Sequence, residues 1–468
     1  MKYILGFLFL VLTYTVSAQN KQLLYNVQEL PQSLLSNPAS VITFDKHIGI
    51  PFLSGFSVEG GSSGVSAYDL FRSDRDINTS IDIAIAELDS KDYFGVNQQL
   101  EILSFGWRSR KSEVYYSGGL YHEIDALVYF PKDIAVLAYR GNADYIDRAF
   151  DFSDLSFTAE SLSVYHFGLQ KQVNDSWQLG VRAKVYMSVA NINSTDNTGT
   201  FVTRTTPEGP NFYSHQLRNV SLGVNTSGIA SLFEEEESTE VNEIVSNAFL
   251  SDNAGFGLDV GFTHFINDQW LVTGSLIDIG FVRHKADVKN FSARGDYETS
   301  GIELEFPGAI QGVETTSYWQ ELEDEFEDAV TLEDSLSSPY ISWRPLKING
   351  SVQYSFGEDR GEGCNCRSKS KRIYKNRVGA HLYSIKRPRG FQTALTGYYE
   401  KQWGNKLLSR VTYTYDKRSS KNIGLLMSAK IDKFNLYLAA DNLLEYSNLA
   451  KARGASLQLG MQLVFNNK

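Results

Sequence analysis

The chain has 468 residues, a formal net charge of −11, 42% apolar and 13% aromatic residues, and only two cysteines. The aromatic content excludes intrinsic disorder, and two cysteines are too few for a disulfide-stapled scaffold. The negative charge argues against a nucleic-acid binder, which needs a clustered basic surface. The seven histidines show no metal-ligand spacing, so we expect neither a metal nor another cofactor.

The first residues predict export. Lys2 precedes an apolar run from Tyr3 to Val16, and the small residues Ser17 and Ala18 then offer a cleavage site. These are the parts of a secretory signal peptide, which we assign to residues 1–18. The apolar run is shorter than the roughly 20 residues that a spanning helix requires. Because no other apolar stretch of that length follows, the exported chain is either soluble or a β-barrel.

Apolar and polar residues alternate along several segments, which predicts extended strands with two different faces. In the segment 456–465 every odd-numbered residue is apolar, and Val464 is the one apolar residue in the opposite phase. In the segment 177–189 the face opposite the apolar one carries Arg182 and Lys184. A packed sandwich core could not accept these charges, but a wet lumen could. We therefore predict that Arg182 and Lys184 face the lumen of a barrel.

Fourteen segments qualify as strands, an even number that is typical of outer-membrane barrels. Their ranges are 47–58, 97–108, 112–122, 162–173, 176–190, 256–266, 269–283, 345–356, 376–386, 391–403, 407–416, 421–431, 433–443 and 454–465. Counted back from the last strand, every second connection is a short turn, and the long inserts 59–96, 123–161, 191–255 and 284–344 fall on the other side. Short periplasmic turns and long outer loops are typical of these barrels. The sequence thus predicts an all-β fold, a transmembrane antiparallel β-barrel of about 14 strands over residues 47–468, in the outer membrane of a Gram-negative cell.

The long inserts are expected to contain short helices. Pro131 and Asp133 predict a helix start and Gly141 its end, and the ranges 240–250 and 317–330 are also helical in pattern. The acidic run Glu234–Glu237 and the acidic residues of 317–330 could hold a divalent cation or ions that bridge lipopolysaccharide. Solvated surface charge is the simpler interpretation, because no calcium-loop spacing is present.

One connection on the short-turn side, 357–375, is long and basic. Its cysteines, Cys364 and Cys366, are too close in sequence for a good disulfide and lack the two further ligands that zinc needs. A basic run follows them, beginning at Arg367. Its last three members are candidates for contact with a periplasmic partner or anionic lipid: Lys369, Lys371 and Arg372. A plain flexible loop is the alternative.

Catalysis has no support in the sequence. The Gly-x-Ser-x-Gly, His-Glu-x-x-His and phosphate-binding Gly-x-x-x-x-Gly-Lys motifs are absent. We therefore expect that the protein is not an enzyme.

Four segments carry a resemblance to a known family: Leu30–Ala39, Ile48–Ser54, Phe130–Asp133 and Asp441–Leu444. They are similar to a family of Bacteroidetes outer-membrane barrels of unknown function (DUF5723-like), over most of the mature chain. That family resembles FadL-type transporters of hydrophobic compounds and the PorV-like and PorP/SprF-like barrels of protein secretion and gliding. In FadL-type proteins an N-terminal hatch with an Asn-Pro-Ala motif plugs a barrel. The resemblance implies that residues 19–46 form a hatch-like segment with Asn37, Pro38 and Ala39 as its motif, and a simple turn before the first strand is the alternative.

Two functions follow from these observations. The first is a barrel that binds or admits a small hydrophobic compound, with the loop helices as a lid. The second is a non-transporting barrel that scaffolds a secretion, gliding or surface complex through a periplasmic or surface protein partner. A soluble β-protein is less favoured. An open porin is also less favoured, since helices that fill the lumen would obstruct flow. Membrane lipid and lipopolysaccharide are expected to surround the barrel in either case.

Overall fold

The computed structural model describes residues 22–206, 212–229, 231, 249–299, 325–358, 374–419 and 421–466. The predicted signal peptide, the acidic run 234–237 and the basic loop residues Lys369, Lys371 and Arg372, with Cys364 and Cys366, lie outside these ranges. No helix among the described residues is long and apolar enough to cross a membrane.

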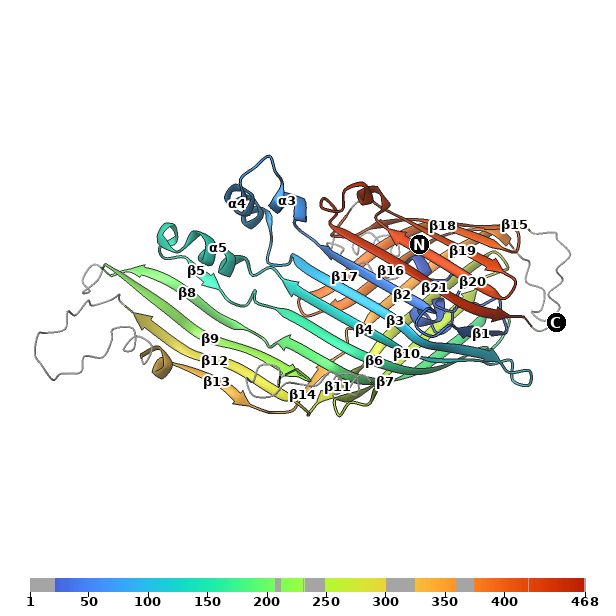
Figure 1. The fold of residues 1–468 in the computed structure, drawn as a ribbon, viewed down its shortest axis with the longest axis horizontal. Coiled ribbons are helices and arrows are strands. Elements are labelled where there is room, and N and C mark those ends of the chain that lie inside the picture. Colours follow the sequence, from blue (N-terminus) through green and yellow to red (C-terminus); the bar gives the residue numbers. More distant parts are fainter. Residues whose placement is uncertain are drawn as a thin grey trace, which may run out of the picture.

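Antiparallel strands form a closed barrel, which in the described part of the chain has fourteen strands (Figure 1). The first strand is interrupted: it consists of β1 (Lys46–Gly49) and β2 (Gly55–Ser62), and both parts pair with the last strand, β21 (Gly454–Phe465), to close the ring. The other strands follow in this order: β3 (Tyr93–Arg108), β4 (Tyr115–Tyr129), β6 (Phe157–Gln172), β7 (Trp177–Ser194), β10 (Ala254–Phe265), β11 (Trp270–His284), β15 (Lys347–Glu358), β16 (Tyr374–Arg387), β17 (Gly390–Trp403), β18 (Leu407–Tyr415), β19 (Asn422–Ile431) and β20 (Phe434–Asp441). Each overlaps a predicted strand, so the predicted barrel is confirmed.

The barrel wall is apolar outside and polar inside. On β20, Leu436 and Leu438 are 37% and 55% exposed, whereas Asn435 in the opposite phase is only 3% exposed. This arrangement reverses that of a soluble protein and is typical of a barrel whose outer face contacts lipid. Val464, the residue out of phase in the last strand, points inward and packs against Leu34 of the N-terminal segment. Its departure from the pattern therefore has a packing reason.

The two rims differ in the length of their connections. Short turns join β19 to β20 and β17 to β18, where Asp432 and Gly404 adopt left-handed backbone angles (φ 56° and 62°), as tight turns require. We call this side the short-turn rim and the opposite side the long-loop rim. The C-terminal strand, β21, ends at the short-turn rim with Phe465.

The long-loop rim carries the helices. They are α3 (Ala67–Phe71), α4 (Ile77–Glu87), α5 (Lys132–Arg140) and the 3-10 turns η2 (Ala143–Tyr145) and η4 (Leu443–Asn448). The helix α5 begins after Pro131 and ends at Gly141, in agreement with the sequence pattern. Of the predicted helix 317–330 the described residues 325–329 are helical, and the predicted helix 240–250 lies almost wholly outside the described ranges. The helices α3 and α4 were not predicted, although a capping box of Ser66 and Asp69 marks the start of α3.

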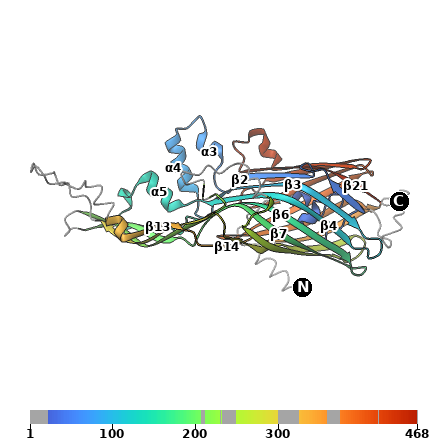
Figure 2. The same ribbon diagram turned by 60° about the horizontal axis from the view of Figure 1, so that its bottom comes forward.

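Beyond this rim the wall continues as a sheet that the sequence pattern did not predict. It comprises β5 (Ala149–Asp151), β8 (Thr198–Thr205), β9 (Tyr213–Ser227), β12 (Val288–Thr299) and β13 (Val330–Leu336), while β14 (Tyr340–Trp343) extends the pairing of β11. The strand β9 pairs with the end of β7 as well as with β8 and β12, so this outer sheet is continuous with the barrel and projects to one side (Figures 1 and 2). Most residues of β12 are partly exposed, which explains the missing alternation.

Candidate functional site

Residues 22–45 lie inside the barrel, and we call them the plug. Apart from the 3-10 turn η1 (Gln22–Leu24) and the one-turn helix α2 (Ser33–Ser36), the plug has no regular secondary structure. Its residues are nevertheless buried, with Leu23, Val27 and Leu30 at 0% exposure. Buried backbone groups need hydrogen-bond partners, and the wall of the barrel supplies them.

The predicted motif Asn37-Pro38-Ala39 forms a buried turn against β7 and β10. Asn37 Oδ1 accepts a hydrogen bond from Ala39 N at 2.9 Å, and Asn37 Nδ2 donates to Phe262 O at 3.4 Å. Two paired wall glycines make room for it: a Cβ at Gly261 would lie 2.1 Å from Asn37 Oδ1, and a Cβ at Gly180 would lie 2.2 Å from the Pro38 carbonyl oxygen. Only glycine permits this close approach.

Wall side chains donate hydrogen bonds to plug carbonyl groups that have no partner within the turn. Thr263 Oγ1 and Gln178 Nε2 donate to Ala39 O at 2.7 and 3.0 Å. Ser275 Oγ donates to Ser36 O at 2.7 Å. The polar inner face of the barrel thus provides the donors that the irregular plug backbone lacks.

Arg182 and Lys184 project from β7 into the lumen, and each is 2% exposed. Arg182 donates to the carbonyl oxygens of Leu34 and Leu35 at 2.7 Å each, at the C-terminal end of α2, where helix carbonyls lack partners. Its guanidinium also pairs with Asp259. Arg182 is therefore a latch that ties the plug to the wall.

Lys184 belongs to a buried charge network above the plug. Lys184 Nζ lies 3.0 Å from Asp259 and 2.5 Å from Asp278. Asp278 sits in a bulge of β11 with φ at 64°, a conformation that turns its carboxylate into the lumen. Lys347 bridges Asp278 and Glu123 at 2.8 and 3.3 Å.

Arg344 completes the network by pairing with Glu123 and Glu160. The network then balances four cations against four anions within the described residues. Such balance is required because a buried charge without a partner is costly.

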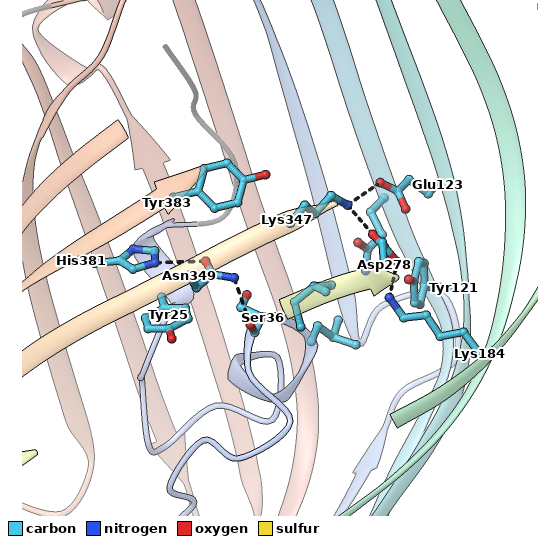
Figure 3. A pocket seen from close by; sticks show the side chains of 13 residues that line it. Tyr25, Ser36, Tyr121, Glu123, Lys184, Asp278, Lys347, Asn349, His381 and Tyr383 are labelled. Carbon is cyan, nitrogen blue, oxygen red and sulfur yellow. Dashed lines mark hydrogen bonds and ion pairs between the residues drawn. The ribbon is translucent and has the colours of Figure 1, made fainter. Parts of the chain in front are cut away.

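A polar cavity lies between this network and the plug (Figure 3). It holds about 500 Å³ of atom-free space, part of it open to solvent. Tyr25, Ser36, Tyr121, Lys347, Asn349 and His381 are among its lining residues, and Leu35 and Ile277 are its aliphatic ones. Charged, polar and aromatic side chains thus share the lining of this cavity.

A second set of latches holds the start of the plug. Arg410 on β18 donates to the carbonyl oxygens of Leu23 and Tyr25 at 3.2 and 2.5 Å. Arg377 on β16 pairs with Glu29 of the plug at 2.6 Å, and Glu400 lies between the two arginines, 2.5 Å from Arg377 and 2.6 Å from Arg410. Burial alone would raise the pKa of Glu29, but the adjacent Arg377 guanidinium outweighs burial and holds that pKa below its ordinary value.

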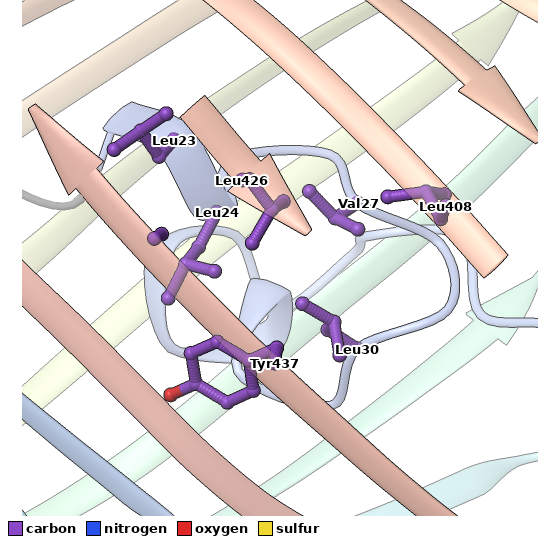
Figure 4. Close-up of a cluster of buried hydrophobic side chains, with 8 residues drawn as sticks. Leu23, Leu24, Val27, Leu30, Leu408, Leu426 and Tyr437 are labelled. Atoms are coloured by element: carbon purple, nitrogen blue, oxygen red, sulfur yellow. The ribbon is translucent and has the colours of Figure 1, made fainter. Parts of the chain in front are cut away.

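One apolar part of the inner wall lies under the plug. Four plug side chains pack against four inward-facing wall side chains of β18, β19 and β20 (Figure 4). They are Leu23, Leu24, Val27 and Leu30 on the plug, and Leu408, Leu426, Tyr437 and Ala439 on the wall. We call these four wall residues the apolar strip.

One strand, β21, separates the interrupted first strand from β20, which carries part of the apolar strip. Pairing with β21 stops at Gly49 opposite Gln462 and resumes at Phe56 opposite Leu459, so six residues oppose two. The bulge exposes Phe52 and Leu53 to 56% and 50% on the outer face. Met461 N donates to Leu53 O at 2.8 Å, which keeps the wall closed.

The plug contacts this break from inside. Gln32 Nε2 donates to Ser54 O, the last residue of the bulge, at 2.8 Å. The same nitrogen lies 3.4 Å from Glu101 Oε2 on the neighbouring strand. Movement of the plug would therefore remove a support from the interrupted first strand.

Sequence reasoning selected Arg182 and Lys184 but missed their partners Asp259 and Asp278, and it missed the latch Arg410. A usable signal existed for Asp259 and Arg410, which occur on the polar phase of predicted strands. Asp278 falls on the apolar phase of its strand and turns inward only through a bulge. Sequence alone could not show which of them face one another. Among the described residues no group of three or more His, Cys, Asp or Glu side chains is placed to hold a metal ion.

These features define the class of protein: a membrane β-barrel whose lumen is closed by its own N-terminal segment. The chain belongs to a family of unknown function, DUF5723, whose model matches residues 38–441. A search of curated proteins finds no match.

Several solved structures align with most of the chain at low identity. The toluene transporter TbuX of Ralstonia pickettii is 10% identical, with 93% of this chain and 94% of that chain covered and a TM-score of 0.41. A FadL homologue of Pseudomonas aeruginosa is 10% identical, with 97% and 98% covered and a TM-score of 0.43. The toluene transporter TodX of Pseudomonas putida is 8% identical, with 96% and 94% covered and a TM-score of 0.38.

Proposed function

We propose that the protein is an outer-membrane barrel whose plug gates the entry of a small hydrophobic compound. In this proposal residues 1–18 are a cleaved signal peptide, residues 19–46 are the hatch-like segment and residues 47–468 are the barrel. The short-turn rim faces the periplasm, and the long-loop rim faces the outside among lipopolysaccharide. No catalytic step is part of the proposal.

The observation that carries the proposal is the position of the apolar strip. Charged side chains such as Lys184, Asp278 and Lys347 line the cavity above the plug. The plug itself covers the apolar side chains Leu408, Leu426 and Ala439. When the plug moves, this strip becomes accessible to a ligand. Only β21 separates it from the interrupted wall segment at 50–54. A hydrophobic compound would gain free energy by covering the strip in place of the plug leucines.

The plug can be locked reversibly to test this proposal. A Cβ at Gly261 would lie 3.2 Å from Asn37 Cγ, so Asn37→Cys with Gly261→Cys places two thiols within reach of a disulfide. Cys364 and Cys366 are first replaced by Ser so that the new pair is unique. The two single-cysteine variants serve as matched controls.

The assay is uptake of two uncharged radiolabelled compounds, a long-chain alcohol and 3-phenylpropan-1-ol, by Gram-negative cells with and without the protein. We expect uptake above background in the reduced double variant, loss of that excess on oxidation, and no effect of oxidation on the single variants. Equal uptake in the locked and unlocked states would contradict gating by the plug. Equal uptake with and without the protein would contradict transport of these compounds.

The outer sheet favours a second function, a scaffold for a secretion, gliding or surface complex. The strands β8, β9, β12 and β13 extend the wall well beyond the rim, which a pore does not need (Figure 1). The basic residues Lys369, Lys371 and Arg372 are the proposed periplasmic contact. Reversing their three charges should change the set of proteins that cross-link to the barrel in cells. An unchanged set of cross-linked proteins would contradict the scaffold function. If uptake also depended on the plug, the transport proposal would be the one that remains.

A further inference from the structure

A buried carboxylate lies directly above the apolar strip. Asp441 ends β20, points into the lumen and is 6% exposed. Ser456 Oγ donates to its Oδ2 at 3.2 Å, and no described cation forms an ion pair with it. Glu59 on β2 has its own cation, since Arg418 forms an ion pair with it. A buried carboxylate without a cation is costly, so Asp441 is set to accept one.

A second oxygen converges on the same point. A Cβ placed on Gly424 would lie 2.4 Å from Asp441 Oδ1 and 2.5 Å from Thr412 Oγ1, so the two oxygens are within about 5 Å of each other. Thr412 is 2% exposed, and its hydroxyl has no hydrogen-bond partner in the described part of the chain. The absence of a side chain on Gly424 keeps the space between these oxygens open.

A third acceptor occurs on the adjacent strand. Gln458, at 2% exposure on β21, pairs with Ala439 of the apolar strip, and its Oε1 also has no partner among the described residues. Asp441 and Thr412 present a carboxylate and a hydroxyl to a group that donates hydrogen bonds and carries positive charge, and Gln458 offers an amide oxygen beside Ala439. A primary ammonium meets both requirements, with three donors and no acceptor.

The apolar strip continues from this group of acceptors. Leu426 is the next inward-facing residue after Gly424 on β19, and Ala439 is the next before Asp441 on β20. The plug covers both parts, because Leu23 Cδ2 lies 3.0 Å from the Cβ position of Gly424. Carboxylate and strip are therefore uncovered by the same movement.

From this juxtaposition we infer that Asp441, Thr412 and Gln458 form a head-group site for a hydrophobic compound that carries a primary ammonium. The apolar body of the compound lies on Leu426 and Ala439 in place of Leu23, and its ammonium donates to Asp441. This inference rests on the proposed function and names the class of compound that the gate admits.

The test uses three probes of equal length that differ in charge: 3-phenylpropylammonium, 3-phenylpropan-1-ol and 3-phenylpropanoate. Equilibrium binding to the purified full-length protein in lipid nanodiscs is measured by isothermal titration at pH 7. We expect the ammonium to bind about tenfold or more tightly than the alcohol, because a hydrogen bond to a charged group is worth roughly 1.5–3 kcal/mol. The carboxylate probe should bind most weakly.

Variants separate the site from the general charge of the lumen. Asp441→Asn should reduce the preference for the ammonium over the alcohol to about twofold, because it removes the ion pair. Thr412→Val, which keeps the shape of the side chain, should lower ammonium binding several-fold and serves if the first variant folds poorly. Asp175→Asn removes the same charge from an exposed turn and should change nothing.

Each outcome decides the matter. Equal binding of the ammonium and the alcohol would overturn the inference while the proposed function stands. An ammonium preference that survives in Asp441→Asn would overturn the assignment of the site. If none of the probes binds and none is taken up by cells, both the inference and the proposed function fail.

Discussion

The latch at Arg182 gives a quantitative prediction. Its guanidinium donates to Leu34 O and Leu35 O at 2.7 Å each, and a hydrogen bond from a charged donor contributes roughly 1.5–3 kcal/mol. Arg182→Met removes both bonds, whereas Asp259 keeps Lys184 at 3.0 Å and so is not left alone. We expect the closed plug to lose about 3–6 kcal/mol. Opening of the plug around α2 should then be at least about 100 times more frequent.

Opening can be measured as the labelling rate of a buried thiol. Ser40 is 0% exposed, and Ser40→Cys in a background without Cys364 and Cys366 gives a single target. A membrane-impermeant maleimide then labels in proportion to the open population when reclosing is fast. Arg182→Lys, which keeps the charge but not the two-pronged geometry, should fall between the parent and Arg182→Met. Equal labelling in all three, with unchanged heat-modifiable gel mobility, would refute the role of Arg182 as a latch.

Three further predictions concern the plug and use the same labelling assay. Gly261→Leu should expel the Asn-Pro turn and raise labelling strongly. Gly350→Leu is the control and should not raise it, because a Cβ there meets no atom within 4 Å. Equal effects of the two substitutions would contradict the docking of the turn. Because the pKa of Glu29 is lowered in the closed state, its pairing with Arg377 stabilises the plug fully above pH 4.5 and loses that contribution as the pH falls further. Glu29→Gln should remove this part of the pH dependence, and an unchanged pH profile would contradict it. Leu30→Ala should weaken closure by about 2–5 kcal/mol, as for other buried leucines, and a change below about 1 kcal/mol would mean that the strip contact does not hold the plug.

The barrel could be predicted from the sequence because its strands obey a strict period. Each residue of β20 faces either lipid or lumen, so Leu436 and Asn435 carry a signal that needs no tertiary information. The lengths of the turns also predicted which rim carries the short connections and which carries the long loops. The helix α5 was accessible for the same reason, since Pro131 and Gly141 are local signals.

The outer sheet and the charge network could not be predicted in this way. Strands such as β9 and β12 are partly exposed on both faces, so no alternation separates them from loops. The pairing of Lys184 with Asp278 depends on a bulge in β11 that turns one residue inward, and the sequence gives no sign of where a bulge occurs. Val464 was likewise unexplained by the sequence pattern. Its apolar side chain on the inner face is explained only by its contact with the plug.

The construction of the plug determines how the gate can open. A segment with one turn of α-helix cannot hold its shape without the wall donors at Arg182, Ser275 and Arg410, so release is local unfolding rather than the sliding of a rigid body. Plug and compound then compete for one surface, because Leu23 occupies the strip that the compound would cover. It follows by linkage that weakening the latch over the strip, as in Arg410→Met, must tighten binding of the compound by the same factor by which that part of the plug opens more often. If Arg410→Met left the affinity for every bound probe unchanged, the strip could not be where the compound binds.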